Sequence, residues 1–543
     1  MNINIPYKGG DDNHKQEEYE LESIATRDNV EYQHPTEIEE IELKSLRRVS
    51  DRIPAAAWYN IAFAFIEAFA YSGSTFIFQN YIQFPPPKHP GDQPGALGKG
   101  QQTATAWSTF FQFWSWGTPV IAAIIADRYL SKFHTIILFS FIFVSGLLIL
   151  TVTSTPAAIK AGVAYPGLIA GIIVTGLGDG LQSISLVMVG EQYPRKENFI
   201  RTLRTGERVI VDPKLTLSSI YHYLYLTLAI GYLAPTITTN IEKYHSFWLA
   251  FLIMALIFSI GVVLYSWSRR WFIETKTGGL QLWKSVLVIR MAIARGFNLE
   301  NAKPSKIPEP HHSNIIWDDK FVEELRTTIH ASKVLLFPSI YWMCYGQMSS
   351  NLVSQAATME TGIFPNDMMS QVDYITLIIL IPFMDKVFYP MLRRRHMEPS
   401  PITRIFIGFM LITVAMSFAA ILQHLIYLKP PCYQFPRCNV ESGGSKVPNY
   451  ISVWWQAPIY VIVAFSEAIT SLDYAYSKSP PSMKSLVMAI NLLTSSIGSA
   501  LALAFVPLAR DPLLPYMFSG MAIVSFVTGC LFLICYSGKK QYN

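Results

Sequence analysis

Long runs of apolar residues recur along the chain, separated by shorter polar stretches. Twelve such runs lie at residues 56–78, 105–126, 133–155, 165–190, 216–238, 245–267, 334–356, 370–392, 403–427, 450–476, 484–508 and 515–537. Each run is long enough to cross the roughly 30 Å of hydrocarbon in a bilayer as a helix. The pattern therefore predicts an all-α polytopic membrane protein with twelve spans.

Polar segments divide these runs into two groups of six. Residues 1–55 are largely polar and acidic, and we expect a disordered cytoplasmic tail there rather than a cleavable signal peptide. The pattern predicts one six-helix bundle at 56–267 and a second at 334–537. A cytoplasmic linker at 268–333 joins the bundles, and a short cytoplasmic tail follows at 538–543.

Basic residues gather in alternate loops, and this sets the expected orientation. These residues are Arg47, Arg48, Arg52, Arg128, Lys132, Arg195, Lys196, Arg201, Arg204, Arg208, Arg269, Arg270, Arg393, Arg394, Arg395, Lys478, Lys484, Lys539 and Lys540. Basic loops favour the cytoplasmic side, so we expect both termini to be cytoplasmic. An even number of spans agrees with this, because it places both termini on the same side of the membrane. We expect a protein of the plasma membrane, although the tail does not distinguish it from an internal membrane.

Composition agrees with this class and excludes others. Of the 543 residues, 51% are hydrophobic and only 15% are charged, whereas soluble domains carry about 25% charged residues. Mean hydropathy is +0.28. The formal net charge of +5 follows from the basic loops. The sequence contains no clustered basic domain of the kind that binds nucleic acid, so we expect no nucleic-acid partner. The expected surroundings of the protein are the lipid bilayer.

Cysteines and short motifs give little sign of catalysis. Cys344, Cys530 and Cys535 lie in apolar runs, and we interpret them as packing residues. Cys432 and Cys438 lie in "KPPCYQFPRCNV", a loop that the topology places outside the cell, where a disulfide is expected. The sequence has no CxxC, HExxH, P-loop or GxSxG pattern. We therefore expect no metal, no cofactor, no enzymatic activity and no ATPase module.

A short charged motif occurs at the same place in both halves. "ADRYLSKFH" follows the second span, where Asp127, Arg128 and Lys132 can latch neighbouring helix ends through charge-assisted hydrogen bonds. "MDKVFYPMLRRR" follows the eighth span, with Asp385 in the equivalent position. The motif resembles the signature of the major facilitator superfamily, although Ser131 stands where glycine is usual. We assign these four charged residues to gating. An ordinary cluster of helix-end charges is the alternative for each motif alone.

Four longer stretches carry a more specific resemblance. They are "GALGKGQQTATAWSTFFQFW", "RTGERVIVDPKLTLSSIYHYLYL", "YWMCYGQMSSNLVSQA" and "VAFSEAITSLDYAYSKSPPSMKS". The chain closely resembles the fungal branch of the proton-coupled oligopeptide transporter family, from about Ser50 to Tyr536. The resemblance implies the twelve-helix major facilitator fold and alternating access. In typical members it also implies uptake of di- and tripeptides driven by protons.

The first span departs from the family's pattern. Family members usually carry an ExxERFxYYG motif, in which the glutamates and arginine take part in proton coupling and the arginine helps to hold the peptide carboxylate. "FAFIEAFAYSG" keeps Glu67 and Tyr71. Ala64 and Ala68 replace the other glutamate and the arginine, and Ser72 replaces a tyrosine.

The fourth and fifth spans lose further polar residues of the family. Gln182 stands at the family's lysine, Ile184 at an asparagine and Ala229 at the asparagine of the fifth span, whereas Tyr225 remains. Both cations of the carboxylate clamp are therefore missing from the first half. An unpaired charge in a low-dielectric cavity costs several kcal/mol, so a free peptide carboxylate should be disfavoured.

One acidic residue of the second half fits the family instead. Glu467 aligns with the glutamate that pairs with the peptide's amino group. We assign proton coupling to Glu67 and Glu467, because carboxylates within a membrane usually have a function. For Glu67 the alternative is a structural remnant that is hydrogen-bonded to Tyr71. Asp179 is expected either to line the cavity or to face a contact between helices.

The spacing of residues on the seventh helix adds candidate contacts. Tyr341, Tyr345, Met348, Leu352 and Gln355 fall on one helical face, although such a stripe is also typical of packing. The complete prediction for substrate contacts is Glu467, Tyr71, Gln182, Tyr225, Tyr345 and Gln355.

These assignments favour a secondary transporter of a small organic solute that lacks a peptide's free carboxylate, such as a modified peptide or an amino-acid-derived metabolite. Protons are its expected coupling ion. One alternative is a conventional proton–peptide symporter in which other residues replace the clamp. Another is a non-transporting nutrient sensor that signals through its tail and linker. Intact helix motifs favour transport over sensing, while the direction of transport is left open.

Overall fold

The computed structural model describes residues 46–89, 92–203, 206–273, 281–296, 298–306, 315–395, 399–439, 446–469 and 484–537. Most of the predicted N-terminal tail and all of the predicted C-terminal tail lie outside these residues. The chain divides into a small unit, Met1–Arg52 with Arg195–Thr216, and a large unit, Ile53–Pro194 with Leu217–Asn543. The large unit contains nearly all of both predicted bundles.

Helices occupy all twelve predicted spans, at least in part. The first half contains α3 (Ala55–Thr75), α4 (Phe78–Gln83), α5 (Gln101–Arg128), α6 (Lys132–Thr153), α7 (Pro156–Lys160), α8 (Ala164–Gly178), α9 (Leu181–Glu191), α10 (Pro213–Gly231), α11 (Pro235–Tyr244) and α12 (Phe247–Trp267). The second half contains α15 (Pro338–Tyr345), α16 (Asn351–Ala357), α17 (Gln371–Phe383), α18 (Tyr389–Arg394), α19 (Pro401–Leu428), α20 (Ala457–Ile469), α22 (Lys484–Leu503) and α23 (Leu514–Ser537). In the described residues, eight helical stretches are long and apolar enough to cross a membrane. This confirms the polytopic all-α class.

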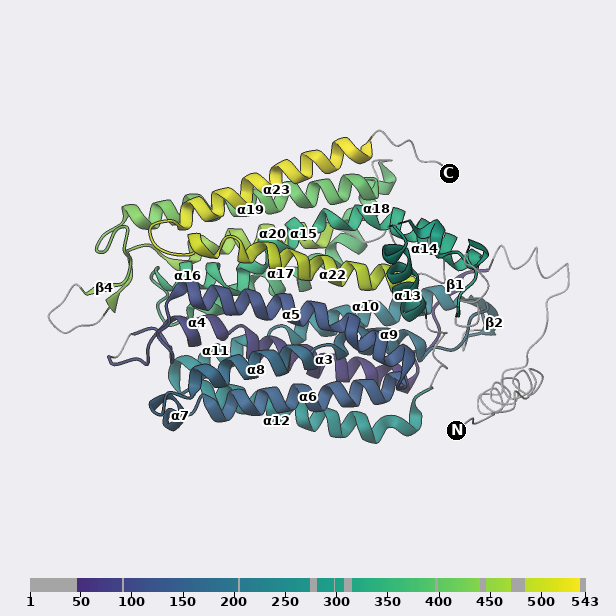
Figure 1. Cartoon of the computed structure of the whole chain (residues 1–543), viewed down its shortest axis with the longest axis horizontal. Helices are drawn as coiled ribbons and strands as arrows, with labels where there is room; N and C mark the ends of the chain where they lie inside the picture. Colours follow the sequence, from purple (N-terminus) through teal and green to yellow (C-terminus); the bar gives the residue numbers. More distant parts are fainter. Residues whose placement is uncertain are drawn as a thin grey trace. The chain divides into compact units, whose positions relative to one another are not determined.

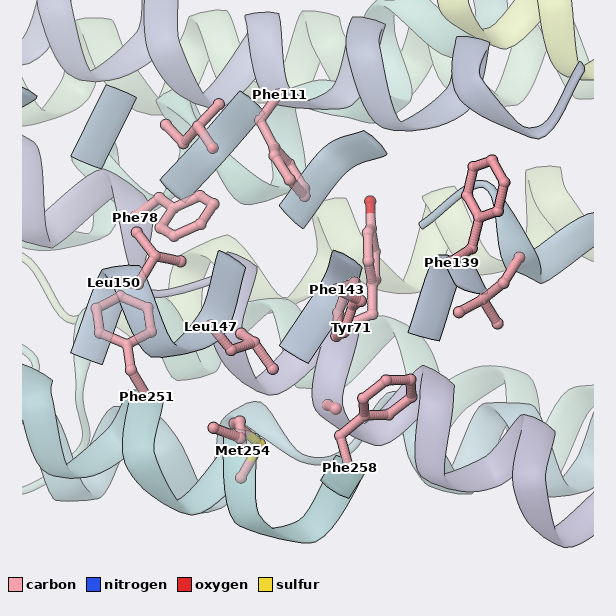
Figure 2. Packing of buried hydrophobic residues seen from close by; sticks show 14 of the residues in the cluster. Tyr71, Phe78, Phe111, Phe139, Phe143, Leu147, Leu150, Phe251, Met254 and Phe258 are labelled. Carbon is pink, nitrogen blue, oxygen red and sulfur yellow. The ribbon is translucent and has the colours of Figure 1, made fainter. Parts of the chain in front are cut away.

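Aromatic side chains form the core of the first half. Phe143 of α6 meets Phe258 of α12 with ring centroids 4.8 Å apart, and Figure 2 shows both rings in the buried cluster. A glycine lets α6 and α8 approach closely, because a Cβ on Gly146 would lie 2.3 Å from the Thr175 hydroxyl oxygen. The two helices therefore depend on a small residue at this crossing.

The second half has its own core. Helices α19 and α23 lie side by side (Figure 1), and Phe409 and Phe532 are buried between them. The hydroxyl of Ser466 on α20 donates a hydrogen bond of 2.8 Å to the Gly408 carbonyl, which ties α20 to α19. Apolar side chains on the outer faces, such as Ile534, are exposed, as expected for helices whose surroundings are lipid.

The described part of the linker between the halves contains several helical segments. It contains α13 (Gln281–Ala294), the 3₁₀ segments η2 (Leu299–Ala302) and η3 (Pro304–Lys306), and α14 (Asp319–Ser332). Asp318 caps α14 by accepting a 3.0 Å hydrogen bond from the Phe321 amide. Hydrogen bonds from Lys303 and Lys306 hold the pKa of Glu300 below its ordinary value. The linker thus has defined local structure.

The small unit contains a three-stranded sheet. The strands are β1 (Arg48–Val49), β2 (Phe199–Thr202) and β3 (Arg208–Val211), with β3 in the centre, parallel to β1 and antiparallel to β2. Asp51 accepts hydrogen bonds from Arg195 at 3.2 Å and Arg201 at 2.8 Å. Residues 46–52, which the sequence placed in the disordered tail, are therefore ordered. Their pairing partners lie far along the chain, so local composition gives no signal of this order.

The loop between α19 and α20 contains the expected cysteine pair. Cys432 and Cys438 are bonded, with Cα atoms 5.5 Å apart. The short strands β4 (Cys438–Asn439) and β5 (Lys446–Val447) pair next to the bond.

We predict that both termini and the 268–333 linker are cytoplasmic. A protease site inserted in this linker should be resistant to protease added outside intact cells, because the basic loops hold this side in the cytoplasm. Permeabilised cells are the control and should show cleavage. Cleavage in intact cells would rule out the twelve-span topology.

We also predict that Cys432 and Cys438 are oxidised in the mature protein, because their loop faces an oxidising compartment in this topology. Peptide mapping without reductant should recover the two cysteines in one linked species, which reduction separates if a protease cuts between them. Recovery of two free thiols would contradict the disulfide.

Candidate functional site

A cavity of about 320 Å³ lies between the two halves of the large unit. Its walls are largely aromatic and apolar, with amide and hydroxyl groups at intervals. The polar and aromatic lining includes Tyr71, Gln112, Trp116, Gln182, Tyr225 and Tyr232 from the first half and Trp342, Tyr345, Tyr374, Glu467 and Asn491 from the second. A solute in this cavity would contact both halves.

Two aromatic pairs cross between the halves at the cavity wall. Trp116 and Trp342 meet edge to face with ring centroids 5.5 Å apart. Tyr232 and Tyr374 stack with centroids 5.1 Å apart and an angle of 7° between their planes. Such pairs contribute about 0.5–1.5 kcal/mol beyond burial, so they help to hold the two halves together around the cavity.

Glu467 is the only carboxyl group among the described lining residues, and none of these residues is lysine or arginine. The hydroxyl of Tyr345 lies in hydrogen-bond contact with the Glu467 carboxyl group. The other Glu467 carboxyl oxygen, Oε2, has no partner among the described residues. The cavity can therefore offer an acidic anchor to an amino group, but its described part offers no cation to an anionic group.

The structure brings five predicted contacts to this cavity and leaves out the sixth. Glu467, Tyr71, Gln182, Tyr225 and Tyr345 all line it.

Gln355 lies elsewhere, fully buried within the second half. Its amide donates to the Ala419 carbonyl at 3.0 Å and to Gln423 at 2.9 Å, and its carbonyl accepts from Gln456 at 3.0 Å. These bonds satisfy the side chain and give it a structural position among α16, α19 and the residues that precede α20.

The seventh predicted span is not one continuous helix. It begins with η5 (Lys333–Leu336), and after α15 the 3₁₀ segment η6 (Gly346–Ser349) interrupts it before α16. Ser350 adopts φ −131° and ψ −95°, and its hydroxyl bonds the Gly346 carbonyl at 3.1 Å. The prediction that one helical face carries all of these residues is therefore wrong beyond Met348. The break in the helix redirects the side chains of Leu352 and Gln355, which are buried in the core of the second half.

Glu67 lies outside the cavity lining. It is only 3% exposed, and its carboxyl group accepts a 2.9 Å hydrogen bond from Ser185 rather than from Tyr71. Asp179 lies at a helix contact, where its carboxyl group is 2.5 Å from the Ser115 hydroxyl. Ser115 is also 3.4 Å from the Tyr71 hydroxyl. Polar groups thus connect Asp179 to the cavity wall through Ser115.

The predicted gating motif of the first half meets the linker. Arg128, at the end of α5, lies over the Trp283 ring of α13 at 4.1 Å. The carboxyl group of the neighbouring Asp127 faces the backbone amide of Leu282, which also lies on α13. The motif therefore links the second span to the linker between the halves.

Lys132, at the start of α6, forms an ion pair with Glu191 at the end of α9. Its charge therefore joins two helix ends of the first half. In the second half, Asp385 lies in the π-helical segment η8 (Met384–Phe388), and its side chain lies outside the described part of the structure.

Several lining residues were missed by the sequence analysis. Trp116, Tyr232 and Tyr374 look like packing aromatics in the sequence, and only the meeting of the two halves shows their position. Gln112 and Asn491 carry a usable signal, because each is a polar amide within an apolar run. Gln112 also donates to Ser349 at 2.7 Å across the halves.

A helical bundle in two halves around a cavity with polar groups is the architecture of secondary transporters. A family model described as the POT family matches residues 133–523. The chain belongs to this family, which confirms the resemblance seen in the sequence.

Relatives and solved structures agree with this assignment. Peptide transporter PTR2 of Saccharomyces cerevisiae is 38% identical over 521 residues, which cover 95% of this chain and 83% of that protein. Peptide transporter PTR_C of Candidozyma auris is 39% identical over 508 residues, covering 93% and 87%. The crystal structure of an auto-inhibited POT family peptide transporter aligns with TM-score 0.69 and 17% identity, covering 90% of this chain and 99% of that one. A POT family transporter in complex with 5-aminolevulinic acid aligns with TM-score 0.64, 17% identity and coverage of 89% and 96%. These structures show the shared fold.

We predict that Glu467→Gln lowers transport by about tenfold to a hundredfold, because a lost charge-assisted contact costs about 1.5–3 kcal/mol. Uptake by cells with matched surface expression would measure this effect. Glu197→Gln, at an exposed acid outside the cavity, is the control and should behave as wild type. Normal transport by the Glu467 variant would place the substrate anchor elsewhere.

Glu67→Gln is expected to have the smaller effect, because Glu67 does not line the cavity and glutamine can still accept the Ser185 hydrogen bond. Uptake should be measured at several external pH values. If this variant loses the pH dependence of transport, Glu67 is instead the proton carrier.

Proposed function

We propose that this protein transports small peptides or peptide-like solutes by proton-coupled alternating access. We further propose that its cavity favours solutes with an amino group at one end and an uncharged polar group at the other. The membrane is the plasma membrane in this proposal, and both termini are cytoplasmic. The single observation that carries the substrate proposal is the lining itself, with Glu467 as its one described carboxyl group and no described cation.

The preference follows from comparing two solvation costs. An anionic terminus entering the cavity would lose its hydration without gaining a paired cation, which costs several kcal/mol. A neutral amide terminus loses less, and the side-chain amides of Gln112, Gln182 and Asn491 can hydrogen-bond to it. Gln182 is partly available for this, since its hydrogen bond to Tyr232 is long, at 3.4 Å.

A conventional di- and tripeptide symporter is the second candidate. Two relatives at 38% and 39% identity are named peptide transporters, and the same three cavity amides could donate hydrogen bonds to a carboxylate. In this case the neutral donors would replace the family's cations. The two candidates differ only in how the cavity treats a free carboxylate.

Paired dipeptides test the difference. We expect amidated dipeptides to compete for uptake about tenfold more strongly than the matching free acids, because a charged hydrogen-bonding group costs about 1.5–3 kcal/mol when unpaired. Equal or stronger competition by the free acids would favour the conventional symporter.

Gln182→Lys should shift this preference toward the free acids, because it places a cation in the lining. Gln182→Met is the control, since it changes the amide without adding charge and should not rescue the free acids. Ala68 is a poorer site for a restored arginine: it is 1% exposed and packs against Gly231 of α10. A Gln182→Lys variant that still prefers amidated peptides would show that the lining charge does not set the choice.

A further inference from the structure

Two buried carboxyl groups meet where the halves join at the end of the bundle that the topology places outside. Glu242 lies on α11 in the first half, and Asp367 lies on the 3₁₀ segment η7 (Asn366–Ser370) in the second. Their exposed fractions are 4% and 0%, and the carboxyl groups are in hydrogen-bond contact with each other. Neither residue lines the cavity described above.

Asparagines surround this pair and extend the contact between the halves. Asn80 of α4 donates to Glu242 at 2.8 Å. Asn80 and Asn366 also exchange two hydrogen bonds of 2.9 Å each, and Asn366 donates to the Val353 carbonyl at 3.1 Å. The acid pair is thus built into a polar network that joins the halves.

The neighbouring residues close this end further. The Lys243 ammonium donates to the carbonyl oxygens of Ile363 at 3.0 Å and Phe364 at 3.1 Å. The Tyr244 hydroxyl donates to the Ile363 carbonyl at 2.9 Å. These bonds fasten α11 to the loop before η7, so opening this end must separate the two acids.

Other titratable groups near the pair do not neutralise it. Lys243 acts on Asp367 through its charge. Among the described residues it forms no ion pair with either acid, and its ammonium group donates hydrogen bonds to backbone carbonyl oxygens instead. Tyr460 of α20 also faces Asp367, and its hydroxyl oxygen lies 3.5 Å from the side-chain oxygen of Gln456. The amides of Asp367 and Met368 lie near the Asp367 carboxyl group, but neither of its oxygens, Oδ1 and Oδ2, accepts a hydrogen bond from a described donor.

Two carboxyl groups in hydrogen-bond contact in a buried site cannot both be ionised, because the like charges repel and neither is hydrated. A proton between them turns this repulsion into an O–H···O hydrogen bond. The Oε2 atom of Glu242 has no other partner among the described residues. When the halves separate, water reaches both groups, and each would ionise at neutral pH as ordinary acids do.

We propose that Glu242 and Asp367 form a proton-binding site that locks the external gate. Closing this gate takes up one proton, which is held between the two carboxyl oxygens, and opening it releases that proton. Because the pair is reached from the external side, its proton returns to the external solution. The site therefore couples the conformational equilibrium to external pH without adding a transported proton.

This inference rests on the alternating access of the proposed function, but not on any particular substrate. The dipeptide experiments can fail without affecting it, and it is tested without substrate.

The test is a distance measurement by electron paramagnetic resonance on the full-length protein in lipid nanodiscs, between pH 5 and pH 8. Spin labels at Lys160→Cys, the last residue of α7, and Arg510→Cys, in a loop, report on gate opening, because both positions are exposed and lie at this end of opposite halves. Cys530 and Cys535 would be replaced by alanine, whereas Cys344 is buried. The wild-type ratio of closed to open populations should rise as pH falls, by up to about tenfold per pH unit for one linked proton.

Glu242→Gln separates the lock from other titrating groups. A glutamine amide can donate to the Asp367 carboxylate without a proton, so this variant should stay closed at pH 8 and lose much of the pH dependence. Glu360→Gln, at an exposed acid in the same loop region, should titrate like wild type. If Glu242→Gln does not fold, Asp367→Asn tests the same pair, and it too should have a flattened response. A wild-type distance that does not change with pH, or a variant that titrates like wild type, would overturn the proposal.

Discussion

The cost of burying a carboxylate without a partner governs much of this molecule. Its helical interior contains several acids, and in the described residues no lysine or arginine forms an ion pair with any of them. Each acid must then find a hydroxyl or amide donor, another carboxyl group or a proton. The acids concerned are Glu67, Asp179, Glu242, Asp367, Asp373 and Glu467.

Different solutions to this cost serve different purposes in the structure. One oxygen of Asp179 is held by Ser115 and one oxygen of Glu67 by Ser185, in contacts between helices of the first half, while the other oxygen of each has no partner among the described residues. Glu467 keeps one oxygen without a partner at the cavity wall, where a solute's amino group can supply the missing charge. The proposed substrate preference and the proposed external gate thus follow from one physical requirement, which is met in separate places.

The fold was predictable from the sequence because twelve apolar runs and the alternation of basic loops are strong, local signals. The position of Glu467 was also predictable, since the surrounding motif is specific. By contrast, Gln355 was misplaced because an ideal helix was assumed across Gly346 and Ser350, where the backbone breaks. The meeting of Glu242 with Asp367 could not be inferred, because it depends on how two distant halves dock. The β1–β3 pairing was missed because its two strands, although both belong to the small unit, lie far apart in the sequence.

In the proposed transport cycle, Glu467 receives the amino group of a solute whose other end is uncharged. An experimental structure of the protein with a bound amidated dipeptide tests this most directly. We expect the ligand's amino nitrogen at about 2.7–2.9 Å from a Glu467 carboxyl oxygen, with the amide terminus near Gln112 or Gln182. An amino group bound away from Glu467, with the amide terminus in its place, would show that Glu467 is not the anchor for the amino group.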